Sequence, residues 1–424
     1  GRFSTSVQQN AVGNGGNIDV QVERLFLDNG SDFFAATFGQ GNAGNISIKA
    51  ADSVFLQNAF VSSSVGKEGI GNGGSINIFT VTLTLTDNNI LSTSISGKGR
   101  AGDVSITANG NVLINNGAFI NSSTEGQGDA GKVSIRTLGD VTISGRGERT
   151  ASLISTGILD TGVGNGSDIE INARNFNLYN GASLISLTAG KGNAGSVIIN
   201  TLDSTTIKDS SIGAFTNGQG NAGKVVIRAG GDVSIVDKSN INNIVTSLAI
   251  GDGGDIEISA SNLLLANGVY LLTTTIGKGN AGSVRINTTG DITIKNASQI
   301  NASTFGEGDA GNVTVNAGNT LFISGTTNDG KFFDSGIFTT VVRDAGFIGK
   351  GKSGNINVTA RNLSLNSAGL SVSSFGDSAG GDIDINSNTV RLDNKSIIAA
   401  ATTSGNGGNI NLTAADFLLL RNNS

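Results

Sequence analysis

The stretch Gly41-Asn42-Ala43-Gly44-Asn45-Ile46-Ser47-Ile48 decides the fold of this chain, because close variants of it occur fourteen times. The sixth and eighth places of this glycine motif are aliphatic in all fourteen copies. Alternating apolar and polar residues place one side of a β-strand in a core and the other in water, and the preceding glycines permit a tight turn. The fourth place is glycine in every copy except at Ser167, and the other copies begin at Gly13, Gly71, Gly99, Gly128, Gly164, Gly192, Gly220, Gly251, Gly279, Gly308, Gly351, Ser378 and Gly405.

The spacing of the motif indicates a repeat protein. Eleven of the thirteen intervals between successive fourth places are 27 to 31 residues long, and each contains three strand-like segments, as at 45–50, 53–57 and 59–64. There is no 3.6-residue periodicity, and glycine recurs where it would break a helix. Three short strands cannot close a sheet alone, but successive coils can pair strand to strand in parallel. We therefore predict an all-β fold, a right-handed parallel β-helix over residues 1–424, with about 28 residues and three short strands per coil and about 14 coils in a single solenoid.

Charged residues offer a test of this register, because like charges on neighbouring coils are unfavourable. All charged neighbours at the fifth and seventh places are of opposite sign, namely Asp103–Lys132, Lys132–Asp168, Lys224–Asp255 and Glu257–Arg285. The second place is Asn or Asp in eleven of fourteen copies, which predicts either a left-handed turn position or a ladder of side-chain amides.

Two segments lengthen their coils and are predicted to leave the solenoid as loops, at 144–164 and 326–351. Loops of this kind often lie on a binding face, although tolerated surface drift explains them as well. The second segment contains Lys331, Phe332, Phe333 and Asp334, and its apolar pair makes these four residues the candidate contact loop.

Composition excludes several kinds of chemistry. The chain has no cysteine and no histidine, so disulfides, thiolate metal sites and a histidine base are impossible. A net charge of −6 without charge runs argues against nucleic acid as a partner, and no apolar stretch is long enough for membrane insertion. Every glycine cluster precedes a strand, unlike a phosphate-binding loop. Acidic places in the motif are not repeated in consecutive coils, so no continuous calcium site forms, and we expect no metal, cofactor or catalytic residue.

An enzymatic alternative nevertheless remains open, because polysaccharide lyases and hydrolases also use solenoids with clustered acids on one face. The outward acids Asp19, Glu170, Glu257 and Asp384 never lie on adjacent coils, which leaves Asp377, Asp382 and Asp384 as the best acid group. A second alternative is a non-catalytic carbohydrate-binding solenoid that uses the Ser/Thr-rich third segment of each coil.

The glycine motif, the three strands per coil and their near-identical reiteration resemble the repeat region of filamentous haemagglutinin-like exoproteins, in its glycine- and asparagine-rich cyanobacterial form. The resemblance covers residues 13–420. It implies a right-handed parallel β-helix that is exported through an outer-membrane partner by two-partner secretion, and a role in adhesion, aggregation or a cell-surface fibre. This chain has no proline, so it does not contain the Asn-Pro-Asn-Gly motif of that family's secretion domain.

The two ends of the chain fall at complementary points of the repeat, which we call matching phases. The chain opens in a third segment, at 3–6, and closes after a second segment, at 417–420, so that the two partial coils together are close to one period. We expect either a piece of a longer rod or head-to-tail stacking of chains. The predicted function is that of a non-enzymatic, extracellular structural or adhesive protein of a cell-surface fibre or adhesin, whose partners are itself, surface glycans or other cells.

Overall fold

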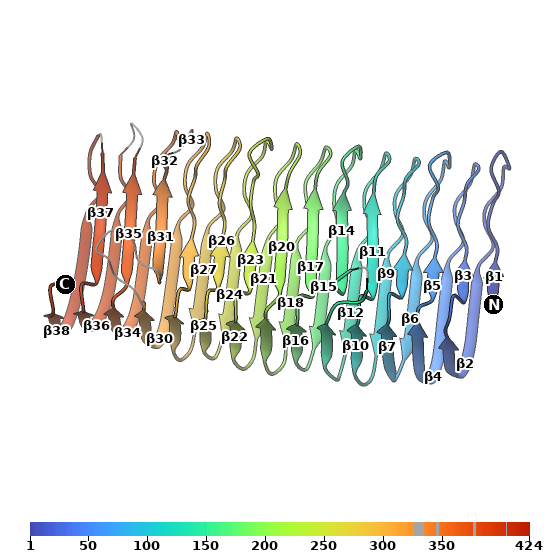
Figure 1. Cartoon of the computed structure of the whole chain (residues 1–424), viewed down its shortest axis with the longest axis horizontal. Helices are drawn as coiled ribbons and strands as arrows, with labels where there is room; N and C mark the ends of the chain where they lie inside the picture. The colour runs from blue at the N-terminus through green and yellow to red at the C-terminus, as the bar shows by residue number, and fades with distance from the viewer. Residues whose placement is uncertain (149, 326–334, 345–346, 376–378, 404) are drawn as a thin grey trace. The chain divides into compact units, whose positions relative to one another are not determined.

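The computed structural model describes residues 1–148, 150–325, 335–344, 347–375, 379–403 and 405–424. These residues form an all-β, parallel β-solenoid of about 14 turns with about 29 residues per turn, which confirms the predicted fold class (Figure 1). The chain divides into two compact units, Gly1–Leu202 with Ser210–Gly223, and Asp203–Asp209 with Lys224–Ser424. Each unit is a stack of coils, and each coil contributes a first, a second and a third strand.

In the first unit, the third strands are short and flank the turns that form the candidate site described below. The first strands, two of which continue into the second, are β2 (Ile18–Leu27), β4 (Ile46–Gln57), β6 (Ile76–Thr80), β9 (Val104–Ala108), β12 (Val133–Thr137), β15 (Ile169–Ala173) and β18 (Val197–Thr201). The separate second strands are β7 (Thr82–Thr86), β10 (Val112–Asn115), β13 (Val141–Ser144) and β16 (Phe176–Tyr179). The third strands are β1 (Arg2–Ser4), β3 (Asp32–Phe34), β5 (Phe60–Ser62), β8 (Ile90–Ser92), β11 (Phe119–Thr124), β14 (Leu153–Ile158), β17 (Ser183–Thr188) and β20 (Ser211–Thr216).

The second unit follows the same plan, with four long strands that merge the first and second positions. Its first strands are β21 (Val225–Ala229), β24 (Ile256–Ala260) and β27 (Val284–Thr288), and its second strands are β19 (Thr205–Lys208), β22 (Val233–Val236), β25 (Leu263–Ala266) and β28 (Ile292–Lys295). The merged strands are β30 (Val313–Ser324), β34 (Ile356–Asn366), β36 (Ile383–Asp393) and β38 (Ile410–Leu420). The third strands are β23 (Asn240–Asn242), β26 (Tyr270–Leu272), β29 (Gln299–Asn301), β31 (Gly336–Val341), β35 (Gly369–Ser374) and β37 (Ile397–Thr402), and β32 (Arg343–Asp344) pairs with β33 (Phe347–Ile348) as an antiparallel hairpin.

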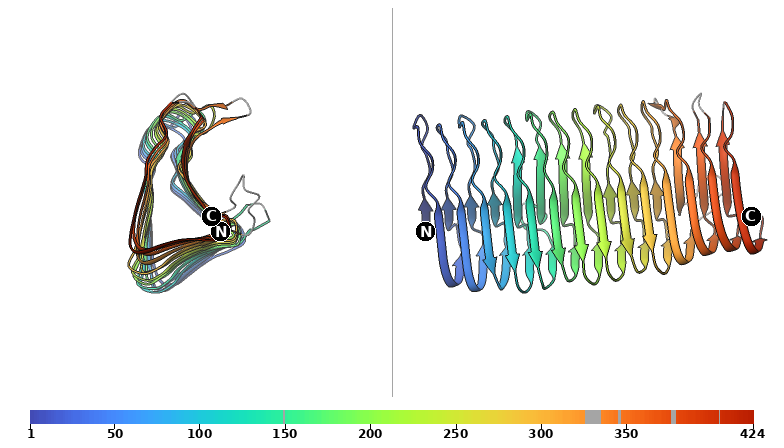
Figure 2. Two further views of the ribbon diagram at one scale, coloured as in Figure 1. Left: turned by 90° about the vertical axis from the view of Figure 1, so that its left-hand side faces the viewer. Right: turned by 180° about the vertical axis from the view of Figure 1, so that it is seen from behind.

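The aliphatic places of the glycine motif form the dry core of each unit. In the first unit, Ile46 pairs with Ile76 and Ile76 with Val104, one coil apart and in parallel, and all three side chains are fully buried. The coils of each unit follow similar outlines when viewed along the stack (Figure 2). The register predicted from the motif is therefore the register of the sheet, and each column of equivalent residues stacks its side chains.

The turn that precedes the first strand, exemplified by residues 41–45, is termed the glycine corner. Gly41, at the first place, has a φ of 131°. A Cβ atom on Gly44, at the fourth place, would lie 1.9 Å from the carbonyl oxygen of Gly16 in the preceding coil. Gly41 is thus favoured by its backbone conformation and Gly44 by close contact between coils, although one coil carries Ser167 at the fourth place.

Side-chain ladders align the glycine corners of successive coils. The Oδ1 atom of Asn42 accepts a hydrogen bond from the backbone N–H of Asn72 at 2.8 Å, and Asn72 in turn accepts from the N–H of Arg100 at 2.9 Å. A second ladder runs through the fifth place, where Asn17 accepts from the N–H of Asn45 at 2.9 Å. Of the two alternatives for the second place, a ladder is present, but its bonds run from backbone N–H groups to side-chain oxygens rather than between side-chain amides, and the positive φ belongs to the first place.

The turn between the second and third strands is termed the asparagine corner, and it has a different construction. Asn29 and Gly30 have φ values of 47° and 78°, and Asp87 and Asn88 have values of 52° and 60°. Two successive left-handed residues make a tight turn that Asn, Asp and Gly tolerate best. This corner therefore needs a particular backbone conformation but leaves its side chains free to differ.

Candidate functional site

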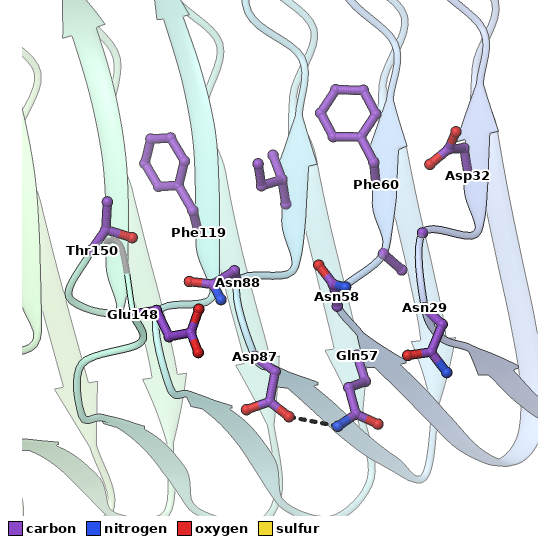
Figure 3. Close-up of a pocket in the computed structure, with 14 residues that line it drawn as sticks. Asn29, Asp32, Gln57, Asn58, Phe60, Asp87, Asn88, Phe119, Glu148 and Thr150 are labelled. Carbon is purple, nitrogen blue, oxygen red and sulfur yellow. Dashed lines mark hydrogen bonds between the residues drawn. The ribbon is translucent and has the colours of Figure 1, made fainter.

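A groove of about 650 Å³ runs along the asparagine corners of the first unit (Figure 3). Its floor is made by successive left-handed turns, and its walls come from the end of the second strand and the start of the third. The lining residues are Asn29, Gly30, Asp32, Gln57, Asn58, Ala59, Phe60, Asp87, Asn88, Ile90, Gly117, Phe119, Glu148 and Thr150.

One wall of the groove is an apolar column. Phe60, Ile90 and Phe119 occupy equivalent places on β5, β8 and β11, and each is half-buried. At about 4.8 Å per coil, the two phenylalanines are roughly 10 Å apart along the stack. The ring of Phe60 also packs against Phe34, with centroids 6.0 Å apart. The wall is therefore an extended apolar strip rather than a single hydrophobic residue.

The opposite wall is polar and partly fixed by hydrogen bonds. Gln57 donates from Nε2 to Oδ2 of Asp87 at 2.6 Å, a contact drawn in Figure 3, and Asn116 donates to the other oxygen of Asp87 at 3.2 Å. Asn29 and Asn58 are exposed at the neighbouring turns. The Asp87 carboxylate is thereby held in place, and the amide groups beside it offer both donors and acceptors to the groove.

The end of the groove nearest β13 is closed by residues of the 144–164 segment. Arg146 and Ala151 form an antiparallel bridge, and the N–H of Gly147 donates to the carbonyl of Thr150 at 2.8 Å. A Cβ on Gly147 would lie 2.6 Å from Oδ1 of Asn88, so glycine lets this hairpin approach the groove floor closely. The hairpin brings Glu148 and Thr150 into the lining. The rest of the segment contains the regular third strand β14.

The candidate contact loop from the sequence, Lys331, Phe332, Phe333 and Asp334, lies outside the described residues, as does Asp377. The other two acids of the best acid group take part in contacts between coils. Asp382 accepts a hydrogen bond from the N–H of Asn409 at 2.7 Å, and Asp384 accepts from the side-chain amide of Asn411 at 2.8 Å. These bonds assign both carboxylates a role in aligning the last coils of the second unit.

Charged residues elsewhere on both units form ion pairs between coils. Lys224 pairs with Asp255 at 2.8 Å, as its place in the register predicts, and this contact raises the pKa of Lys224. Lys132 pairs with Glu170, at the seventh place of the next coil. The hydrogen bonds from Lys132 and then Asn172 hold the pKa of Glu170 below its usual value. Glu170 is thus stabilised in its charged form by structural partners.

Hydroxyl groups of the third segment point inward as well as outward. Ser63 donates to the carbonyl of Gly44 at 2.6 Å and accepts from the N–H of Gly74 at 2.9 Å, and it is fully buried. Ser122 makes the equivalent pair of bonds to Gly102 and Gly131 at 2.7 and 3.1 Å. These hydroxyls satisfy the backbone of the glycine corner across the coil, so they are not available to a ligand on the third face.

No family model, curated protein or solved structure matches this chain. Its candidate site therefore depends on the geometry described above. Within the described ranges there is no cluster of three or more acidic side chains suited to a metal ion, and no helical segment that could cross a bilayer.

Sequence reasoning missed the groove, although one signal for its floor was present. Four Asn-Gly pairs, at 29–30, 116–117, 180–181 and 267–268, lie between a second and a third strand, whereas others, as at 72–73, lie at different turns. Such pairs are a strong sign of a turn with two left-handed residues. The walls carry no comparable signal, because Phe60 and Phe119 become neighbours of the same column only once the register is known.

Proposed function

We propose that this chain is a non-enzymatic, extracellular structural or adhesive protein, acting in a cell-surface fibre or adhesin. The observation that carries the proposal is the use of outward polar groups for contacts between coils. Asp382, Asp384 and Glu170, three of the acids an enzyme could use, each bond to a residue of a neighbouring coil. A surface whose polar groups hold the stack together suits a mechanical role better than catalysis.

The proposal includes head-to-tail association of chains. On the last merged strand, β38, Phe417 and Leu418 are about half exposed, at 50% and 49%, whereas Val390, which pairs with Leu418, is fully buried. An open parallel edge with apolar side chains favours the addition of another β-helical coil. The matching phase of the first and last segments is compatible with a second copy as the source of that coil, and equally with further coils of a longer rod.

Electron microscopy of the purified chain over a range of concentrations tests this association. We expect thin, unbranched filaments at high concentration, with an axial repeat set by the number of coils in one chain. A variant with charged residues on the open edge, Phe417→Lys with Leu418→Glu, should stay monomeric while keeping its β-sheet circular dichroism. Wild-type particles that stay monomeric at every concentration would remove the polymeric part of the proposal.

The extracellular location and the outer-membrane secretion partner rest on the resemblance to filamentous haemagglutinin-like exoproteins. Protease treatment of intact cells provides the test. A surface fibre should be degraded by external protease while a cytoplasmic marker survives, and the same cells should bind to other cells or glycan-coated surfaces less strongly after treatment. Protection of the chain in intact cells would contradict the proposed location.

The alternative is a polysaccharide lyase or hydrolase on the same scaffold. Release of reducing or unsaturated sugar ends from a panel of polysaccharides would favour it, and loss of that release in Asp384→Asn would assign the chemistry to that carboxylate. We expect no release from the wild-type chain.

A further inference from the structure

We propose that the groove along the asparagine corners of the first unit binds an uncharged oligosaccharide chain. This inference goes further than the proposed adhesive function, on which it depends only for its biological context, by naming a site and a ligand class. It rests on three features of the groove: its charge, its amide groups and its apolar strip.

The charge of the described part of the groove disfavours anionic ligands. Among the lining residues that the structure describes, Asp32, Asp87 and Glu148 are acidic and none is a lysine or arginine. Asp32 is paired with Arg2, through bonds of 3.0 and 2.6 Å, whereas Asp87 accepts from the uncharged side chains of Gln57, Asn116 and Thr86, and Glu148 is exposed. A polyuronate or a sulfated glycan would bring like charge into this space, which costs binding free energy.

The amide groups distinguish a neutral ligand from a cationic one. Asn29, Gln57, Asn58 and Asn88 all line the groove. The exposed carboxamides of Asn29 and Asn58 offer both donors and acceptors, whereas Nε2 of Gln57 is bonded to Asp87 and Oδ1 of Asn88 is buried. A cation needs acceptors alone, whereas a sugar hydroxyl both donates and accepts. The mixture of amides with two carboxylates, Asp87 and Glu148, that form no ion pair within the described residues therefore matches a polyhydroxylated, uncharged chain better than a string of ammonium groups.

The apolar strip supplies the contact area that hydroxyl groups cannot. Phe60, Ile90 and Phe119 line one side of the groove over three successive coils, and Asp32 continues their column at one end. Gln57 and Asp87 lie on the other side from the two phenylalanines (Figure 3). Binding sites for small molecules commonly combine such apolar surface with a few polar groups that fix orientation. A sugar ring has an apolar C–H face and a rim of hydroxyls, so it can contact both walls at once.

The groove also has the shape for a chain rather than a single sugar. Its lining runs through the successive turns at Asn29, Asn58 and Asp87–Asn88 to Gly117, and the hairpin with Glu148 and Thr150 closes one end. The repeat of the turns, at about 4.8 Å per coil, offers equivalent contacts at regular intervals. The hairpin would then determine where a bound chain stops.

Isothermal titration calorimetry with the full chain tests the inference. The neutral probes are cellohexaose, xylohexaose and mannohexaose, the anionic probe is hexagalacturonate and the cationic probe is hexalysine. We expect at least one neutral hexaose to bind, with weaker or undetectable binding of the two charged probes. Preferential binding of hexalysine or hexagalacturonate, or the absence of binding by every neutral probe, would overturn the inference.

Three variants locate the binding. Phe119→Leu keeps an apolar side chain, as Leu153 does in the same column, but removes the ring, and we expect affinity to fall about threefold to tenfold. Asn58→Asp keeps a residue that Asp87 shows to be compatible with the left-handed turn, but removes a donor and adds charge, so a similar loss is expected. Phe79→Ala removes an exposed ring from the first strand, outside the groove, and should leave affinity unchanged.

Equal affinity in wild type, Phe119→Leu and Asn58→Asp would show that a neutral sugar binds elsewhere and would overturn the assignment of the groove. Thermal unfolding of each variant controls for loss of fold. Because the titration uses dissolved chains, its outcome is independent of filament formation and surface location, and failure of the proposed function can be recognised separately.

Discussion

The two corners of each coil, although built from similar small and polar residues, differ in what they allow. At the glycine corner a Cβ on Gly102 would lie 2.1 Å from the carbonyl oxygen of Gly74, so a side chain cannot be added there without a shift of the backbone. At the asparagine corner Asn29, Asn58, Asp87 and Asn116 keep one backbone conformation, with φ from 46° to 52°, and differ only in side chain. The first corner determines how coils stack, and the second leaves a surface on which binding residues can vary.

The largest expected effect tests whether glycine is needed at the fourth place because neighbouring coils touch there, or simply because of its place in the motif. Gly102→Ala should destabilise the surrounding coils by about 3 kcal/mol, in the upper part of the range for overpacked interiors. Gly16→Ala changes the same place of the motif, but the nearest atom to its Cβ is Cβ of Thr5 at 3.4 Å, so it should stay within about 1 kcal/mol of wild type.

Hydrogen exchange of the amides in β9 and β2 provides the measurement, because stacked coils can open locally rather than in one step. Faster exchange in β9 with Gly102→Ala, together with unchanged exchange in β2 with Gly16→Ala, is the expected result. Equal effects of the two substitutions would show that the glycine requirement is not a matter of contact between coils.

A second effect concerns the inward hydroxyls that connect the third strand to the glycine corner. Ser122→Ala leaves the N–H of Gly131 without this partner, while the carbonyl of Gly102 still accepts from Thr93, and should cost about 1–3 kcal/mol. Ser122→Thr keeps the hydroxyl, and Thr93, at the equivalent place of the preceding coil, donates to the same carbonyl at 2.6 Å. The loss in thermal stability should therefore be much smaller for threonine than for alanine, and similar losses would show that packing rather than hydrogen bonding is involved.

The amide ladder should give a smaller effect. Asn42→Ala removes the acceptor for the N–H of Asn72 and should cost about 1 kcal/mol. Asn42→Asp retains an acceptor, as Asp129 does for the N–H of Asn165 at 2.7 Å, and should be close to neutral. The comparison is made by thermal unfolding at neutral pH, and a loss with aspartate equal to that with alanine would argue against the ladder.

The smallest effect is a pH dependence from an ion-pair column in the second unit. Glu307 lies 3.4 Å from both Lys350 and Lys278, and hydrogen bonds first from Lys350 and then from Lys278 lower its pKa. Because the folded pKa is below the unfolded value of about 4.3, this contribution is present above that pH and disappears as the pH falls through the folded pKa. The difference in melting temperature between wild type and Glu307→Gln should shrink below about pH 4 and also in high salt. A difference in melting temperature that stayed constant with pH would contradict a stabilising role for the charged form of Glu307.

The parts of the fold that repeat could be predicted from sequence, and the parts that occur once could not. The Ile and Val places fix the strand register, and Glu257 does lie opposite Arg285, as expected from that register. The groove depends on Phe60 and Phe119 sharing a column and on the hairpin that brings Glu148 beside them. No periodic constraint acts on those residues, because stacking of the coils requires only that outward side chains be compatible with solvent. A single sequence therefore reveals the residues that every coil shares more clearly than the residues that give one coil its own function.

The ladders at the glycine corners also have a direction. Each side-chain oxygen accepts a hydrogen bond from a backbone N–H of the coil that follows it, as Asn14 does from Asn42 and Asn42 does from Asn72. The direction is the same in the second unit, where Asp252 accepts from Asn280. A stack of such coils is therefore chemically polar, with acceptors pointing toward one end and donors toward the other. Two stacks can be extended through this contact only when they run the same way, so growth by this route excludes symmetric, face-to-face pairs.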